Sequence, residues 1–472
     1  MNTSLMPPRV FPPLNKDFLP AVLARRAFQH AVDSVGTRLV IGLERNDGEF
    51  SRFELKIFPE GHPNHIANFE YVERIVKFLL WQRGGFKIYI GGPRQVADHI
   101  RKCYSVDGIH KFDYHFMGEQ VYERQFEVIS CEPEEVPASR ETGKLIGRNV
   151  QGYRIGFDLG ASDRKVSAVV DGNPVYSEEV IWEPRKNFDP EYHYSEIMTA
   201  LKTAAGKMPR VDAIGGSSAG IYVDNRPMVA SLFRGIPQER FGEIRNMFLR
   251  IRDEMGVPLE VINDGDVTAL AGSMSIEDNG ILGIALGSSE AAGYVNMEGR
   301  IVGWLNELAF APIDYSPNAP VEEWSGHKGC GASYFSQQCV FRLAPKAGID
   351  IPTDLTDAEK LKFVQSKLEA SDEGALKIWQ SMGVYLGYGI AHYADFYDMK
   401  HVLILGRCTS GRGGDLLVEG AKKVFDVEFP ELLKRIELHL PDEKIRRVGQ
   451  SVAAASLPAV QVAKELPNEI SS

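Results

Sequence analysis

A strand–acid–turn–strand pattern at residues 155–166, with the sequence IGFDLGASDRKV, constrains the fold of this chain more than any other segment. The apolar run to Phe157 predicts a buried strand, and Asp158 follows near its end. The small residues Gly160–Ser162 predict a tight turn with outward-facing backbone N–H groups, and a second strand restarts at Val166. Such a turn beside a carboxylate suits a metal–phosphate complex, because the N–H groups hold phosphate and the carboxylate holds water on the metal. Taken alone, the segment is equally compatible with an ordinary hairpin that has a polar end.

Two further segments of the same kind follow at domain-scale spacing. The apolar strand Leu259–Ile262 leads into Asn263 and Asp264. An Asp at the end of a buried strand is a natural general base for a hydroxyl nucleophile. The strand Ile281–Leu286 then leads into a second small-residue turn, which carries two hydroxyl groups. Two candidate phosphate turns with a strand-end Asp between them are far more specific than any one of these features.

Together these segments resemble the actin-like ATPase superfold and, within it, the ROK family of sugar kinases and sugar-responsive repressors. The stretch Asp158–Lys165 looks like the family's first phosphate motif, in the longer form used by hexokinases. Asn263–Asp264 looks like its catalytic dipeptide, and Leu286–Gly293 lies where its second phosphate motif belongs. The helix Gly383–Tyr397, the following strand and Gly406–Arg407 are similar to the elements that hold adenosine. The chain is thus identified as a divergent member of the family.

The resemblance implies an α/β protein with two lobes of the actin-like ATPase (ribonuclease H-like) fold and an additional N-terminal α/β domain. We expect the accessory domain at residues 1–131 and the first lobe at residues 151–275, followed by the second lobe at residues 276–472. The polar stretch 132–150, which contains two prolines, is expected to link the accessory domain to the first lobe.

The resemblance also implies ATP-dependent phosphorylation of the primary hydroxyl of a sugar or polyol. Asp264 would act as the general base, and Asp158 would position Mg²⁺ through water. The implied sugar-binding residues are Asn263, Glu307, Ser218 and Gly220, although 218–220 is as readily interpreted as a plain strand-to-loop turn. The implied nucleotide- and phosphate-binding residues are Asp158, Gly160, Ala161, Ser162, Lys165, Gly287, Ser288, Ser289, Gly406 and Arg407.

The sugar-binding region departs from the family pattern. Three residues after Glu307, where the family has a histidine, this chain has Phe310, and Ala332 replaces an expected sugar-binding glutamate. The family's zinc motif keeps its glycines but only one cysteine, Cys330. Because zinc requires three or four converging ligands, Cys330 with a lone His327 predicts no zinc site.

The second phosphate turn departs from the pattern as well, because Glu290 introduces a negative charge. A buried carboxylate beside a polyphosphate is electrostatically costly unless it is protonated or bound to a metal. These departures support a second hypothesis, in which the chain is a sugar-binding regulatory protein on a ROK kinase scaffold and no longer transfers phosphate.

The composition favours a soluble, cytoplasmic protein of two or three domains. The chain has 472 residues, of which 44% are hydrophobic and 25% charged. Five scattered cysteines without paired spacing argue against a disulfide framework. No apolar run is long enough to cross a membrane, and the N-terminus does not resemble a signal peptide, so we expect no membrane partner. The family resemblance suggests a homodimer.

A DNA-bound repressor, the third hypothesis, is disfavoured by charge and by the N-terminal pattern. The net charge is −11, whereas nucleic-acid binders usually present a basic face. The first 131 residues predict a helix, a hairpin at 37–58, further helices at 68–82 and 94–104 around a strand, and a β-rich segment at 111–131. This order is either a degenerate copy of the first lobe's half-fold or an unrelated α/β domain. Neither is a compact trihelical DNA reader, so we expect no nucleic-acid partner.

Overall fold

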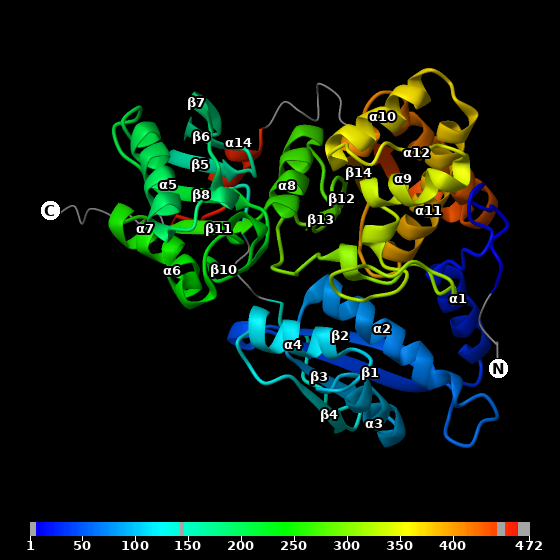
Figure 1. Cartoon of the computed structure of the whole chain (residues 1–472). Helices are drawn as coiled ribbons and strands as arrows, with labels where there is room; N and C mark the ends of the chain where they lie inside the picture. The colour runs from blue at the N-terminus through cyan, green and yellow to red at the C-terminus, as the bar shows by residue number, and fades with distance from the viewer. Residues whose placement is uncertain (1–5, 142–145, 441–448, 461–472) are drawn as a thin grey trace, which may run out of the picture. The chain divides into compact units, whose positions relative to one another are not determined.

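The computed structural model describes residues 6–141, 146–440 and 449–460. The chain divides into two compact units (Figure 1). Unit 1 contains residues 1–145 and 268–447, and unit 2 contains residues 146–267 and 448–472. Within the described residues, no helix combines the length and apolar character needed to span a bilayer.

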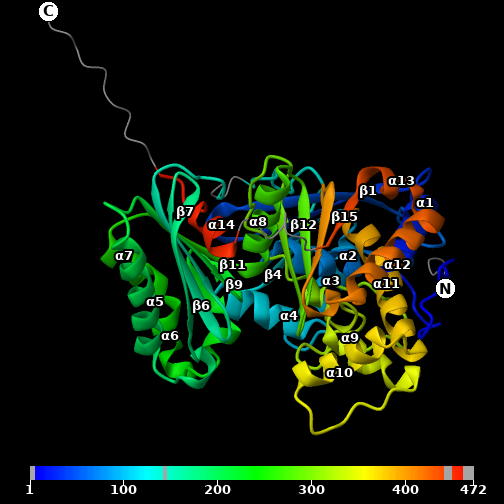
Figure 2. The same ribbon diagram turned by 90° about the horizontal axis from the view of Figure 1, so that it is seen from above.

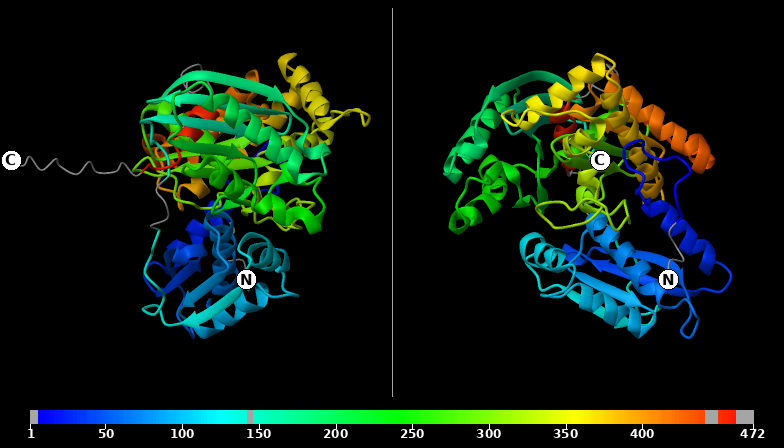
Figure 3. Two further views of the ribbon diagram at one scale, coloured as in Figure 1. Left: turned by 90° about the vertical axis from the view of Figure 1, so that its left-hand side faces the viewer. Right: turned by 45° about the vertical axis from the view of Figure 1, so that its right-hand side comes forward.

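Unit 2 is built on a five-stranded sheet in the order β11-β8-β5-β6-β7, whose broad strands are seen in Figure 3, left. Strands β5, β6 and β7 form an antiparallel meander, and β8 and β11 run parallel to β5. The hairpin between β6 and β7 turns at Asp171 and Gly172, which have φ of 48° and 82° as a tight two-residue turn requires. The strands are β5 (Tyr153–Leu159), β6 (Asp163–Val170), β7 (Asn173–Ile181), β8 (Ala213–Ser218) and β11 (Leu259–Asn263).

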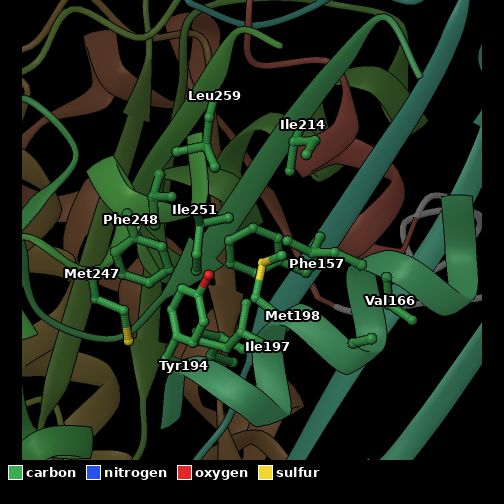
Figure 4. Close-up of a cluster of buried hydrophobic side chains, with 14 of the residues drawn as sticks. Phe157, Val166, Tyr194, Ile197, Met198, Ile214, Met247, Phe248, Ile251 and Leu259 are labelled. Atoms are coloured by element: carbon green, nitrogen blue, oxygen red, sulfur yellow. The ribbon is translucent and has the colours of Figure 1, made fainter. Parts of the chain in front are cut away.

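One face of this sheet carries the hydrophobic core of unit 2. Phe157 of β5 and Ile214 of β8 point toward α5 (Pro190–Ala205) and α7 (Met247–Met255), as Figure 4 shows. The rings of Phe157 and Phe248 stack with centroids 6.0 Å apart. Because side chains alternate along a strand, the core face fixes which strand residues point the other way. The unit also contains α6 (Phe241–Arg245), β9 (Ile221–Val223) and β10 (Arg226–Val229).

The opposite face of the sheet is covered by α14 (Gln450–Ala455), which packs directly on two neighbouring glycines. A Cβ at Gly156 of β5 would lie 1.6 Å from the carbonyl oxygen of Ser451, and one at Gly215 of β8 would lie 1.7 Å from that of Ala454. The helix backbone therefore approaches the sheet more closely than any side chain permits. The second lobe was expected to run to residue 472, whereas this helix belongs to unit 2.

We predict that Gly215→Ala destabilises the protein by about 1–3 kcal/mol, because the added methyl group overlaps the Ala454 carbonyl. Urea unfolding followed by circular dichroism measures the loss. The control is Gly242→Ala in α6, where a Cβ meets nothing within 4 Å and the helix propensity of alanine is favourable. An equal loss of stability in both variants would contradict the close-packing argument.

The second lobe, in unit 1, contains a four-stranded sheet in the order β13-β12-β14-β15. An antiparallel hairpin of β12 (Ile281–Leu286) and β13 (Glu290–Val295) is followed by β14 (His401–Leu405) and β15 (Glu437–His439), where β14 runs parallel to β12 and β15 parallel to β14. Helix α8 (Asp264–Ile276) lies beside β12 (Figure 2), and a Cβ at its Gly272 would lie 2.1 Å from Leu403 of β14. The other helices are α9 (Gln337–Leu343), α10 (Asp357–Glu369), α11 (Glu373–Tyr393), α12 (Arg412–Glu428) and α13 (Pro430–Arg435).

The N-terminal domain, also in unit 1, has its own four-stranded sheet in the order β2-β1-β3-β4. Its β1 runs antiparallel to β3, whereas the corresponding pair in unit 2, β5 and β8, is parallel. The interpretation of this domain as a degenerate copy of the half-fold is therefore wrong. Its elements are α1 (Ala21–Val32), β1 (Thr37–Glu44), β2 (Phe50–Ile57), α2 (Ala67–Arg83), β3 (Lys87–Gly91), α3 (Arg94–Cys103), α4 (Lys111–His115) and β4 (Glu127–Cys131).

One sequence expectation for this region needs correction. The segment 111–131, expected to be β-rich, forms α4 and a π-helix at Phe116–Val121 before β4 begins. Its aromatic residues favour strands locally, but Phe112 and Phe116 pack against Trp81 of α2, and this packing overrides the local preference. In the stretch expected to be a linker, Val136 is buried and Arg140 exchanges backbone hydrogen bonds with Phe50 of β2.

The N-terminal domain is joined to the second lobe within unit 1. Arg25 of α1 forms an ion pair of 2.5 Å with Asp395, just after α11, and Phe78 of α2 stacks on Phe396. The preceding N-terminal arm lies beside the orange helix α12 (Figure 3, right), where the Arg9 guanidinium donates to the carbonyl of Val427 at 2.7 Å. The accessory domain and the second lobe therefore share buried contacts.

Candidate active site

The predicted catalytic residues of unit 2 lie at the carboxyl ends of three parallel strands. In the register of the sheet, Asp158 of β5 is opposite Ser217 of β8, and Ser218 is opposite Asn263 of β11. Because parallel strands end at the same edge, residues that are about a hundred positions apart in the chain meet there. Asp264 follows Asn263 directly as the first residue of α8.

Asp158 is a carboxyl group with a perturbed titration. Burial raises the pKa of Asp158 to about 6, helped by the negative charge of Asp264 and opposed by the hydroxyl of Ser217, which donates a 2.6 Å hydrogen bond to it. A bound cation compensates two neighbouring carboxylates that burial disfavours. The donor set therefore fits the Mg²⁺ ion expected from the sequence.

Asn263 and Asp264 are held by the start of α8. The Asn263 carboxamide donates to the carbonyl of Gly220 at 2.8 Å and accepts from the N–H of Gly265 at 2.7 Å, as a helix N-cap does. Burial raises the pKa of Asp264, although nearby backbone N–H groups oppose the rise. Asn263 thus ties the Gly220 loop to the residue expected to be the base.

The loop at residues 218–220, expected to bind the sugar, is constrained at Gly220 and at Ser218. Gly220 has φ of 129°, and a Cβ there would lie 2.5 Å from the carbonyl oxygen of Val229, so only glycine fits. The hydroxyl of Tyr222 donates to Ser218 Oγ at 2.7 Å. Tyr222 was not predicted from the sequence, because a tyrosine four residues beyond Ser218 on a short strand carries no motif.

The first phosphate turn closes between β5 and β6. The N–H of Gly160 donates to the carbonyl of Asp163 at 2.9 Å, and the indole of Trp182 donates to the carbonyl of Gly160 at 2.9 Å. Ala161 and Ser162 are both exposed at its tip. Lys165 lies opposite Asp158 in the register, but its ammonium group lies 3.8 Å from carboxylate oxygens of both Asp163 and Glu179.

The second phosphate turn and the adenosine loop meet within unit 1. The N–H of Gly287 donates to the carbonyl of Ser289 at 3.1 Å, and both serines of the turn are exposed. Gly406 has φ of 91°, and a Cβ there would lie 2.5 Å from the carbonyl oxygen of Leu286, at the end of β12. Arg407 is exposed beside it. The structure therefore brings together two segments that the sequence separates by more than a hundred residues.

Glu290 points away from the exposed turn and into the interior. Its side chain accepts a 3.1 Å hydrogen bond from the hydroxyl of Tyr393, and its other oxygen is so close to Gly331 that a Cβ there would lie 1.8 Å away. Burial raises the pKa of Glu290 to about 8; the Tyr393 hydrogen bond opposes this, and the charge of Glu307 adds to it. A neutral carboxyl in the interior removes the electrostatic objection to phosphate at this turn.

We predict that Glu290→Gln changes the pH dependence of stability. Between a pKa near 4.5 in the unfolded chain and about 8 in the folded one, only the folded state holds the proton, so stability falls as pH rises, by at most about 1.4 kcal/mol per pH unit. The Gln variant lacks this loss. Urea unfolding at about pH 5 and about pH 8 should show the variant gaining relative to the native protein.

The control for this measurement is Glu298→Gln, in the exposed turn after β13. Its stability relative to the native protein should not change with pH. A Glu290 variant whose relative stability is the same at both pH values would show that this carboxyl is already ionised in the fold.

Glu307, the expected sugar-binding acid, lies in a segment bonded to the N-terminal domain. Its N–H donates to the carbonyl of Trp81 at 3.0 Å, and the N–H of Asn306 donates to the carbonyl of Gln82 at 2.9 Å. These carbonyls belong to the last turn of α2, where the helix leaves backbone acceptors without an intrahelical partner. The accessory domain therefore fixes the backbone that carries Glu307.

Phe310 and the segment that matches the family's zinc motif also contact the N-terminal domain. The Phe310 ring packs on Trp81 at a centroid distance of 4.6 Å and on Trp324 at 5.4 Å. His327 turns toward the N-terminal domain, where its Nε2 lies 2.6 Å from Lys77 Nζ and 2.9 Å from Asp113 Oδ1. The sequence did not predict this buried cluster, because its members come from three distant segments.

Lys77 and Asp113 form the charged centre of this cluster. Lys77 Nζ donates to Asp113 Oδ2 at 2.5 Å, and Asp113 is fully buried. Burial opposes ionisation of Asp113, but the charge of Lys77 and the hydrogen bond of His327 hold its pKa below the usual range. Burial likewise lowers the pKa of Lys77, and Asp113 opposes that change.

We predict that Asp113→Asn destabilises the protein by about 3–5 kcal/mol, because it leaves the Lys77 ammonium buried without a countercharge. Urea unfolding at neutral pH measures the loss. The control is Asp98→Asn, which breaks the exposed pair with Arg101 on α3 and should cost less than about 1 kcal/mol. If both variants lost the same small amount, the buried pair would not hold the two parts of unit 1 together.

Similarity to known proteins identifies the fold that carries this site. No protein-family model matches the chain. Over 190 residues, which are 38% of this chain and 56% of the relative, it is 25% identical to the glucokinase of Halalkalibacterium halodurans. The chain thus spans little more than half the length of this curated relative.

Solved structures extend the comparison. The fold is similar to that of the ROK hexokinase from Thermus thermophilus, with a TM-score of 0.51 and 17% identity over 65% of this chain and 97% of that one. A ROK family glucokinase from Streptomyces griseus, in complex with glucose and AMPPNP, aligns with a TM-score of 0.46 and 19% identity over 64% and 98% of the two chains. Over the 65% of the chain that aligns, the protein has the α/β fold of this hexokinase, which confirms the fold class expected from the sequence.

Proposed function

We propose that this protein transfers a phosphoryl group from ATP to a primary hydroxyl of a sugar or a related polyol. The observation that carries the proposal is the meeting of Asp158, Asn263 and Asp264 at one edge of the unit 2 sheet. A buried carboxyl whose pKa is raised is a suitable general base for a hydroxyl at neutral pH. The names of the glucokinase and hexokinase relatives support a hexose as the acceptor.

Each residue has a defined part in this proposal. Asp264 takes the proton from the sugar hydroxyl, and Asn263 keeps the Gly220 loop beside it. Asp158 is the residue that would hold Mg²⁺, which would supply charge neutralisation of the phosphate oxygens. Phosphoryl transfer needs mainly positioning and charge compensation, so these residues form no covalent intermediate.

The remaining predicted residues bind the two substrates. We assign the turn at Gly160, Ala161 and Ser162 and the turn at Gly287, Ser288 and Ser289 to phosphate, and Gly406 and Arg407 to the nucleotide. Ser218 and Glu307 are assigned to the sugar. The homodimer expected from the family resemblance stays a prediction.

We predict that Asp264→Asn lowers kcat by about 10²–10⁴-fold with little change in sugar binding, because the amide cannot accept the proton. A coupled assay for ADP release over a panel of hexoses, aminosugars and polyols measures the rate. Asp253→Asn, at an exposed position on α7, is the matched control and should keep full activity. Undiminished phosphotransfer by the Asp264 variant would overturn the assignment of the base.

The second candidate, a sugar-binding regulatory protein, is favoured by one observation. The segment that carries Glu307 and Phe310 is hydrogen-bonded to the accessory domain, and the Phe310 ring packs against Trp81 of that domain. Thermal shift distinguishes the two candidates, since a ligand that binds only the folded state raises Tm. A shift with Mg²⁺–ATP supports the kinase, whereas a shift with a sugar and none with the nucleotide supports the regulator.

A further inference from the structure

Two histidines and a glutamate converge on one face of the second-lobe sheet, away from the residues assigned to the nucleotide. His401 is the first residue of β14, and Glu437 and His439 are the first and last residues of β15. In the parallel register His401 is opposite Glu437, and His439 follows two positions later on the same strand. Because side chains alternate along strands, all three lie on the same face of the sheet.

The candidate ligand atoms are close enough to share one ion. His401 Nδ1 lies 2.9 Å from His439 Nε2 and 3.7 Å from a carboxylate oxygen of Glu437, and that oxygen lies 3.8 Å from His439 Nε2. Zinc bound at about 2.0–2.1 Å in a tetrahedron holds its ligand atoms roughly 3.4 Å apart. Small side-chain rotations therefore bring the three atoms onto a common centre.

The orientation of His401 is already the one that a metal ligand needs. Its other ring nitrogen, Nε2, lies 3.0 Å from Asp278 Oδ2, and a backbone-anchored carboxylate there fixes the ring. Asp278 is itself held, because its Oδ1 accepts from the N–H of Asn279 at 2.7 Å and from Lys400 at 3.2 Å. A histidine that ligates a metal through one nitrogen commonly donates its other N–H to a carboxylate.

The chemistry of the three ligands selects the class of ion. Ca²⁺ and Mg²⁺ bind mainly through oxygen, and here two of the three ligands are imidazoles. Imidazole favours Zn²⁺, Ni²⁺ and Cu²⁺, and lysines such as Lys422 and Lys434 around the same hollow disfavour an ion held by charge alone. The hollow, about 530 Å³ and lined in part by Asp278, His401 and Glu437, gives a hydrated ion access.

We propose that His401, Glu437 and His439 form a binding site for a divalent transition-metal ion of the zinc class, with Asp278 orienting His401. The site is distinct from the Cys330 region, where the sequence predicted no zinc. It lies where β14 begins, whereas Gly406 and Arg407 follow the end of that strand, so it does not depend on the proposed kinase activity.

Such an ion would fasten the edge of the sheet. β15 has three residues and pairs only with β14 among the described strands (β12 and β15, the two neighbours of β14, are labelled in Figure 2). Three residues give few ladder hydrogen bonds, so the strand gains little stability from pairing alone. An ion that joins both histidines and Glu437 adds a cross-link between β14 and β15, and ligand binding to the folded state alone raises Tm.

The test is titration of the full-length, chelator-treated protein with Co²⁺ and Zn²⁺ in the presence of excess Mg²⁺, which occupies oxygen-ligand sites such as Asp158. Absorption spectroscopy of bound Co²⁺ reports imidazole coordination, and calorimetry with Zn²⁺ gives the stoichiometry and Kd. We expect one ion per chain and a higher Tm with Zn²⁺. His439→Gln and Glu437→Gln should each weaken binding by more than about tenfold, and Asp278→Asn by about 10–100-fold.

The matched control is His30→Gln, which removes an exposed imidazole from α1 and should leave the Kd unchanged. Circular dichroism of each variant without metal verifies that it is folded. Absence of stoichiometric binding by the native protein would overturn the proposal. So would binding that His439→Gln and Glu437→Gln leave intact.

Discussion

The parallel alignment of β5, β8 and β11 is the constraint on which the candidate active site depends. Three strands that end at one edge place Asp158, Ser217 and Asn263 side by side, although the turns and helices between them occupy about a hundred residues. That alignment in turn requires glycine at 156 and 215, because α14 packs its backbone directly on the opposite face of the sheet. A side chain at either glycine would move the helix away or distort the strands that carry the acids.

Two buried carboxyl groups, Glu290 and Asp113, have different protonation states in this protein. Within the described part of the chain Glu290 forms no ion pair, and burial makes it a neutral acid across much of the physiological pH range. Asp113 is equally buried, but the adjacent Lys77 keeps it ionised. The first arrangement couples stability to pH, whereas the second joins two parts of unit 1 by a contact that is costly to break from one side only.

The contacts of the N-terminal domain indicate its structural role. It supplies α2, whose last carbonyls accept from the segment that carries Glu307, and whose Lys77 and Trp81 pack against His327 and Phe310. Where the sequence shows a motif that has lost its soft metal ligands, the structure shows a buried ion pair and an aromatic cluster. These contacts stabilise the segment that carries Phe310 and His327 by packing and charge pairing.

The sequence by itself determined the strands, the turns and the strand-end acids, because alternation, small-residue turns and helix caps are local signals. It therefore predicted the actin-like fold, the bounds of β12 to the residue, and the adjacent amide and acid of Asn263 and Asp264 at the end of a strand. Only the tertiary structure decided that Glu290 faces the interior, that residues 111–121 are helical, and that α14 returns to the first lobe's sheet. Those outcomes depend on packing between segments far apart in the chain, and no local pattern records which distant surface a residue will meet.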